Sequence, residues 1–422
     1  MYLKLIIYIL IHIMKTVVSF TLPSIDDIKC TNVRNFKIPG FDNLRTRANK
    51  ARALLDDPYR TDRKRYTAIV ALFEYEHIFR PLVHERYNAS NVSNAWLKAW
   101  EMYKEYKVIP AAADTFVYMD NAAFPGSWIL AAWHMVNTEC EIKDFKWYGS
   151  SLSTPSADNK GPLEDSYGLW KNYPNNWLMS ADNNGDVTIF ENQKKFYKKL
   201  GGTVDLYTSD LGFDVSSDYN REEEIHSHAN LGQIITGLMV LKGKSAEHGG
   251  GAMITKQYTF MTPFLVSIMG ALTRIFDRVD ICKPMFSRSG NSESYLVCIG
   301  YHGFDPTDRK SVQSILLNRL TNFSLKPLIT KSCLGNDFIR VIQQAQTHFV
   351  EAQIIKLNLL ISEYKRFRNE KKIDKNYIKN NNAFAKENRK HQHNWLIRNE
   401  IKIIDNSKQL NVIEVINRYQ RH

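Results

Sequence analysis

Short apolar runs that end in polar residues recur through the middle of this 422-residue chain, and such runs are typical of strands buried on both faces of a sheet. They lie at 115–120, 145–149, 204–210, 252–256, 279–283 and 295–299. Apolar residues at helical spacing fill several of the gaps, most clearly at 221–241 and 263–276. Strands that alternate with helices predict an α/β fold with a mostly parallel, doubly wound sheet and helices on both faces.

The same patterning divides the chain into four parts. Residues 1–20 are an apolar N-terminal segment, 21–110 a helical and basic region, 111–304 the α/β domain, and 305–422 a helical region rich in Lys and Asn. Inside the α/β domain, 150–176 is rich in Ser, Pro, Asn and Gly and predicts a long loop. Ligands of such domains bind at the carboxyl ends of the strands, so candidate chemistry is sought there.

The apolar N-terminal segment has three interpretations. The run 5–14 lies between Lys4 and Lys15, which is the outline of a signal peptide, although no convincing small-residue cleavage site follows. The same run could be a buried helix, or it could precede the true start of the protein, since Met14 could initiate translation. No stretch is long enough for a transmembrane helix, so no stable membrane association is expected.

Composition adds a preference for a polyanionic partner. Hydrophobic residues make up 44% and aromatic residues 12% of the chain, as in a folded protein, and the net charge is +12. Such a surplus favours a polyanionic partner, because each neutralised phosphate releases counterions. A Lys- and Asn-rich genome bias explains the charge equally well.

The five cysteines are odd in number, widely spaced and without a CxxC pair. This argues against a disulfide framework or a structural zinc site and favours a reducing compartment such as the cytoplasm. No His/Cys spacing suggests a metal ligand set, and no metal is expected.

The segment 120–128, between an apolar strand and an apolar helix, is a first candidate site. Its small residues would let a ligand approach the backbone, where the helix amino terminus supplies free N–H groups. The residues of this turn that could contact such a ligand are Asp120, Ala122, Pro125, Gly126, Ser127 and Trp128. Asp186 is a second candidate, because a carboxylate beside a pocket can accept hydrogen bonds from ribose hydroxyls. Taken alone, each segment is better explained as a structural turn.

Charged residues also stand at the ends of three later strands. Asp210 and Lys256 each close a buried-strand pattern, and Glu293 stands at the entrance to the last strand. A lysine there is costly to bury unless it is paired or its pKa is lowered. Singly, these residues would be a turn aspartate and an exposed lysine.

Taken in order, these segments carry a resemblance. The chain resembles the FtsJ-like RNA 2′-O-methyltransferase family, including cap-specific enzymes, and more narrowly the branch carried by large cytoplasmic DNA viruses. The similarity runs over 94–303 and is strongest in KPxxSRxxNSExYLV at 283–297. It implies a Rossmann-like methyltransferase fold with helical N- and C-terminal extensions.

The resemblance implies a Lys-Asp-Lys-Glu tetrad. The AWLKAWEM segment places its first lysine at Lys98, with Lys104 and Lys107 on nearby turns. Asp210, Lys256 and Glu293 supply the other three. S-adenosyl-L-methionine is the implied cofactor, held by the turn at 120–128 and by Asp186.

The implied reaction is methylation of an RNA ribose 2′-hydroxyl, on the cap-proximal nucleotide of mRNA. Lys256 would be the general base, which requires a neutral amine, whereas a free lysine has a pKa of about 10.4. Burial and the neighbouring Lys98 are expected to lower the pKa of Lys256. Asp210 and Glu293 would orient the two amines.

The resemblance implies capped mRNA as a partner and is compatible with a second, capping subunit as another. The implied location is the host cytoplasm, with packaging into the virion as a variant. A catalytically inactive RNA-binding or scaffold subunit stays open, because Phe124 and Ser127 replace residues usual in the cofactor turn. A ribosomal or transfer RNA 2′-O-methyltransferase stays open as well.

Overall fold

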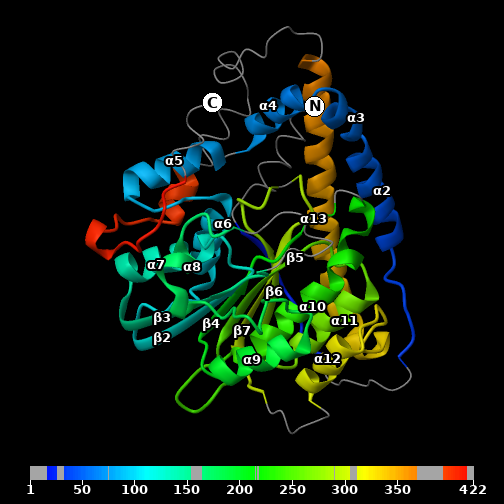
Figure 1. Cartoon of the computed structure of the whole chain (residues 1–422). Coiled ribbons are helices and arrows are strands. Elements are labelled where there is room, and N and C mark those ends of the chain that lie inside the picture. Colours follow the sequence, from blue (N-terminus) through cyan, green and yellow to red (C-terminus); the bar gives the residue numbers. More distant parts are fainter. Residues whose placement is uncertain are drawn as a thin grey trace.

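The computed structural model describes residues 17–25, 33–74, 76–153, 164–213, 215, 218–288, 290–304, 311–367 and 393–415 (Figure 1). Within them, seven strands form one sheet in the order β1-β6-β7-β5-β4-β2-β3. The strands are β1 (Val18–Thr21), β2 (Ala112–Asn121), β3 (Glu141–Ser150), β4 (Leu206–Ser209), β5 (Ala252–Gln257), β6 (Phe276–Lys283) and β7 (Ser294–Tyr301).

The six predicted strands are confirmed, and so is the mostly parallel sheet. Strands β2, β3, β4 and β5 run parallel to one another, while β7 is antiparallel to both β5 and β6. Five of the seven described strands therefore share one direction. The edge strand β1, antiparallel to β6, was not predicted. Strand β1 includes the last three residues of the apolar N-terminal segment, and the run 5–14 lies outside the described residues.

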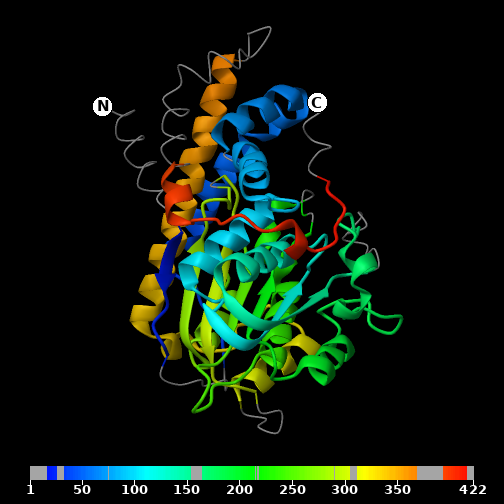
Figure 2. The same ribbon diagram turned by 90° about the vertical axis from the view of Figure 1, so that its left-hand side faces the viewer.

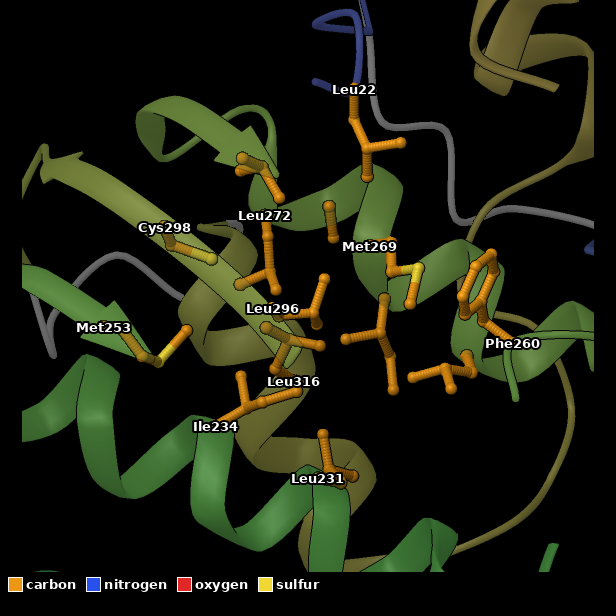
Figure 3. Close-up of a cluster of buried hydrophobic side chains, with 14 of the residues drawn as sticks. Leu22, Leu231, Ile234, Met253, Phe260, Met269, Leu272, Leu296, Cys298 and Leu316 are labelled. Carbon is orange, nitrogen blue, oxygen red and sulfur yellow. The ribbon is translucent and has the colours of Figure 1, made fainter. Parts of the chain in front are cut away.

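Helices cover both faces of the sheet, as predicted. On one face lie α6 (Asn94–Tyr106) and α7 (Ser127–Glu139), whose apolar residues form one core with β2 and β3. On the other face lie α9 (Phe190–Leu200), α10 (Glu222–Val240), α11 (Pro263–Leu272) and α12 (Val312–Thr321). Figure 3 shows part of this second core, where Leu231 and Ile234 of α10 approach Leu316 of α12.

Two predicted elements differ from the structure. The helix expected over 263–276 ends at Leu272, because Phe276 already pairs with Tyr301 in the sheet. The loop expected over 150–176 contains α8 (Leu169–Asn172) and the 3₁₀ helix η1 (Pro174–Asn176). The carboxylate of Asp165 caps α8 by accepting from the N–H groups of Trp170 and Lys171. Residues 154–163 of this loop lie outside the described part.

The N-terminal region is helical, as predicted. It contains α2 (Phe41–Ala53), α3 (Asp56–Thr61), α4 (Arg63–Phe73) and α5 (Glu76–Tyr87). Beyond the sheet, α13 (Lys331–Phe367) is interrupted at Gly335 and packs along α2 and α4 (Figure 1). Two further 3₁₀ helices are η2 (Tyr219–Arg221) and η3 (Asn406–Lys408). None of the described helices combines the length and apolar character needed to cross a bilayer.

Residues 393–415, the last described part of the chain, lie across α6 and α7 (Figure 2, red on cyan). The indoles of Trp100 and Trp133 donate to the carbonyls of Asn399 and Lys408, at 2.8 and 2.7 Å. The amide of Asn91 donates to the carbonyl of Ile413 at 2.9 Å. This part of the C-terminal region is therefore packed onto the surface formed by α6 and α7.

Candidate active site

The four residues of the predicted tetrad converge on one point at the carboxyl ends of the strands. Lys98 Nζ lies 3.3 Å from Asp210 Oδ2 and 3.1 Å from Glu293 Oε1. Lys256 Nζ lies 3.3 Å from Asp210 Oδ1 and 4.0 Å from Glu293 Oε2. Each carboxylate is thus shared by both amines, and two positive and two negative groups meet in one cluster.

The sheet order explains this convergence. Asp210 directly follows β4, Lys256 lies in β5, and Glu293 directly precedes β7, and these are three adjacent strands. Because β7 runs antiparallel to β5, its beginning lies beside the end of β5, and the end of β4 lies on the other side of β5. Lys98 reaches the same point from α6, where its side chain is 8% exposed.

Lys98, and neither of its neighbours, completes the cluster. Lys104 is one to two turns farther along α6 and forms an ion pair with Glu139 at 2.6 Å. Lys107 is the residue at which α6 ends. Ser93 fixes the start of this helix, because its side chain accepts from the N–H of Trp96.

Tyr295 is a central residue of the cluster that sequence reasoning missed. Its hydroxyl donates to Asp210 Oδ1 at 2.8 Å and accepts from Lys98 Nζ, also at 2.8 Å. In the sequence it is one tyrosine in a buried strand, and such residues are usually core. Its register opposite Lys256 on the neighbouring strand is what brings it into the site.

The charges of the cluster hold one another in the ionised form. Burial alone would raise the pKa of Asp210, but Lys256 and Lys98 lower this pKa to about 2. The pKa of Glu293 is lowered in the same way: burial opposes the shift, and Lys98 and Lys256 outweigh it. Both carboxylates are therefore anions throughout the physiological pH range.

The expected lowering of the pKa of Lys256 is wrong for this structure. Burial does act in that direction, but Asp210 and Glu293 together outweigh it and raise the pKa. Carboxylate oxygens of Asp210 and Glu293 lie 3.3 and 4.0 Å from Lys256 Nζ, and the sequence alone does not give these distances. Their attraction favours the protonated form of Lys256.

A cavity of about 280 Å³ opens beside this cluster. It lies at the ends of β2, β3 and β4 and against the first turns of α10. Residues that line it include Asn121, Ala122, Ser151, Asp186, Gly212 and Phe213. This is the position that ligands of doubly wound sheets occupy.

Gly212 connects the cavity to the amine of Lys256. It lines the cavity, and a Cβ placed on it would lie 2.8 Å from Lys256 Nζ and 2.5 Å from the hydroxyl of Tyr258. No side chain larger than hydrogen fits there unless the amine moves. The amine of Lys256 therefore lies directly behind Gly212, which itself lines the cavity.

Two of the predicted cofactor-binding residues, Ala122 and Asp186, line this cavity. Asp186 Oδ1 also accepts from the N–H and the hydroxyl of Thr188, which fixes the turn that presents it. Asp120 does not line it. Its carboxylate is buried and accepts from the hydroxyl of Thr208 at 2.7 Å, whereas its neighbour Asn121 faces the cavity.

The other predicted cofactor-binding residues of this turn do not line the cavity: Pro125, Gly126, Ser127 and Trp128. Gly126 has a φ of 116°, and a Cβ there would lie 2.1 Å from Leu169 Cδ1, so that glycine is required for the packing of α8. The Ser127 hydroxyl lies 2.8 Å from that of Ser93.

Phe124, the residue that departs from the family's usual turn, packs away from the cavity. Its ring lies 4.8 Å from that of Trp177 and 5.8 Å from that of Trp170, measured between centroids. Its side chain is therefore accommodated by two tryptophans and does not occupy the space next to Lys256.

His226 fixes the loop that carries Asp210 and Gly212. Its Nε2 accepts from the N–H of Phe213, so the proton lies on Nδ1, which donates to the carbonyl of Glu222. The ring is stacked between those of Phe213 and Tyr258, with centroids 4.1 and 4.2 Å away. Only the neutral imidazole can make this pair of hydrogen bonds.

We expect acid to destabilise the fold through His226. Burial lowers its pKa to about 4, against about 6.5 in the unfolded chain. Between these two pH values the unfolded state binds a proton that the folded state does not, so the free energy of unfolding falls as the pH drops. The total loss over this range is on the order of 3 kcal/mol. Urea unfolding of wild type and His226→Gln between about pH 6.5 and 4.5 measures this. The wild type should lose more stability than the variant, and parallel curves would contradict the assignment.

Comparison with known proteins fits this geometry. Residues 91–301 match the family described as FtsJ-like methyltransferase. A probable methyltransferase of African swine fever virus (isolate Pig/Kenya/KEN-50/1950) is 32% identical over 362 residues, which cover 83% of this chain and 80% of the relative. The chain belongs to the FtsJ-like methyltransferase family.

More distant relatives of this FtsJ-like methyltransferase include a cellular enzyme. The cap-specific mRNA (nucleoside-2′-O-)-methyltransferase 2 of Mus musculus is 25% identical over 325 residues, covering 74% of this chain and 40% of the relative. An uncharacterized protein of Acanthamoeba polyphaga mimivirus is 26% identical, covering 76% and 39%. The family and the virus relative show that this chain is a methyltransferase. In the described part of the chain, no group of three or more His, Cys, Asp or Glu residues could hold a metal ion.

Proposed function

We propose that this chain transfers a methyl group from S-adenosyl-L-methionine to a ribose 2′-hydroxyl of RNA, at the cap-proximal nucleotide of mRNA. The observation that carries the proposal is the cluster of Lys98, Asp210, Lys256 and Glu293 beside a cavity at the ends of the strands. An amine next to such a cavity can remove the proton of a weakly acidic hydroxyl once it has lost its own proton, and the two carboxylates fix its position.

The cavity fits this methyl donor in its chemistry. Asp186 offers a carboxylate to ribose hydroxyls, and Asn121 and Ser151, which also line the cavity, offer further polar groups. Leu211, Phe213 and Ile225 supply apolar surface for a planar base. S-adenosyl-L-methionine supplies an electrophilic methyl group on a positively charged sulfur.

Within this proposal, Lys256 removes the proton from the 2′-hydroxyl. The carboxylates of Asp210 and Glu293 raise the pKa of Lys256 in the structure, so its proton must leave before it can act. Any positive charge that enters the cavity beside Gly212 would lower this pKa. Lys98 and Tyr295 hold Asp210 in place, and Asp210 in turn orients Lys256. The 2′-hydroxyl of the RNA would therefore meet the amine of Lys256 in a fixed orientation.

Methyl transfer to capped and uncapped transcripts tests this function. Purified protein with labelled S-adenosyl-L-methionine should methylate capped RNA and give little product with uncapped RNA. Equal transfer to both would favour a ribosomal or transfer RNA enzyme. No transfer to either, with no donor binding by calorimetry, would overturn the proposal in favour of a scaffold subunit.

A further inference from the structure

The connection between β6 and β7 carries Glu293, which contacts Lys98 and Lys256. Lys283, the last residue of β6, forms hydrogen bonds to several residues of this connection. Lys283 Nζ donates to Asn291 Oδ1 at 3.0 Å, to the Asn291 carbonyl at 3.2 Å and to Ser287 Oγ at 3.3 Å. It also donates to the backbone carbonyl of Glu293 itself. One partly buried ammonium group therefore binds residues at both ends of the connection.

The outer side of this connection is held by elements from other parts of the chain. Ser292 Oγ donates to a carboxylate oxygen of Glu222, at the start of α10. Arg288 Nε lies 3.3 Å from Glu74 Oε1, at the end of α4. These contacts attach the residues on either side of Asn291 to two separate helices.

The third outer contact comes from α13, which lies beyond the segment that matches the family. Gln353 is 2% exposed and its Nε2 donates to the carbonyl of Gly290 at 3.2 Å. A Cβ on Gly290 would lie 3.8 Å from Lys356 Cγ and 3.9 Å from Leu357 Cδ2, so α13 packs directly on this turn. Gly290 is three residues from Glu293, and a displaced turn would displace the carboxylate.

We propose that Gln353 of α13 is a positioning residue for catalysis, which acts with Lys283 to hold Glu293 against Lys98 and Lys256. The inference rests on the proposed function, since it takes Glu293 to act in methyl transfer. It gives α13 a role in the reaction: the helix fixes a catalytic carboxylate through one backbone hydrogen bond. Displacement of that carboxylate by about 1 Å would lower the rate, because methyl transfer depends on orientation.

The variants Gln353→Met and Lys283→Met test this positioning role. Both keep a long side chain and remove the donor. We expect kcat to fall by about 10- to 100-fold, as for a displaced catalytic group, with the KM for S-adenosyl-L-methionine unchanged. Gln343→Met is the matched control, because Gln343 lies on the same helix and also donates to a loop carbonyl, that of Pro39 at 3.0 Å. Its kcat should equal that of wild type.

Hydrogen exchange of the peptides that contain 290–293 gives a readout independent of activity. Exchange should be faster in Gln353→Met than in wild type or Gln343→Met, at equal midpoints of thermal unfolding. Unchanged exchange, or faster exchange with unchanged kcat, would overturn the inference. A wild-type chain that transfers no methyl group would overturn the proposed function instead, and exchange would still decide whether Gln353 holds the turn.

Discussion

Lys256→Ala is expected to lower kcat for methyl transfer by about 10²- to 10⁴-fold, the usual contribution of a general base. The substitution removes the amine that lies 3.3 Å from Asp210 Oδ1 and next to Gly212, a residue of the cavity lining. The side chains of Asp186, Asn121 and Ser151 are not altered, so the Kd for S-adenosyl-L-methionine should stay close to that of wild type. Initial rates and calorimetry measure the two effects separately.

Two further variants establish that the chemistry of Lys256, and not its charge, is responsible. Lys256→Arg keeps the positive charge but cannot lose its proton, so it should be as inactive as Lys256→Ala. Lys104→Ala removes a lysine from the ion pair with Glu139, away from the cluster, and should retain wild-type activity. Full activity in Lys256→Arg would show that this residue only supplies charge.

Gly212→Ala is the second substitution with a large expected effect. The new Cβ would lie 2.8 Å from Lys256 Nζ and 2.5 Å from the hydroxyl of Tyr258, which is too close for either contact. Because the amine is at the end of a flexible side chain, it would move away, and misplacing it should lower kcat by about 100-fold. For the same reason, the midpoint of thermal unfolding should change little. Steady-state kinetics and thermal unfolding provide both values.

Gly249→Ala is the matched control for this substitution. Gly249 has no atom within 4 Å of the corresponding Cβ position, so an alanine there meets open space. The control should match wild type in both rate and stability. If Gly212→Ala were equally active, Lys256 Nζ would not need its position beside the cavity.

Most of the sheet and three residues of the cluster could be predicted from strand patterns. Asp210, Lys256 and Glu293 stand at strand ends, and adjacent strand ends meet in space. Lys98 required the family resemblance, because a lysine on an amphipathic helix has no feature that distinguishes it from a solvated one. The structure selects it over Lys104, which is paired elsewhere.

The remaining features depend on contacts that no local pattern encodes. The direction of the pKa shift of Lys256 follows from the distances to two carboxylates, which come from other strands. The role of Tyr295 depends on its register opposite Lys256. The contact between Gln353 and Gly290 joins residues 63 positions apart, and Gln353 lies on a helix outside the family match.

Alkaline hydrolysis of the methylated RNA tests the central claim, that the cluster acts on a ribose hydroxyl. Alkali cleaves RNA through the 2′-oxygen, so a 2′-O-methyl group protects the phosphodiester bond on the 3′ side of its own nucleotide. We expect label from S-adenosyl-L-methionine to appear in a fragment that keeps this bond intact, and Lys256→Ala to give at most about one hundredth as much of it. Label in a fragment cleaved at that bond, as base methylation would give, would contradict the claim.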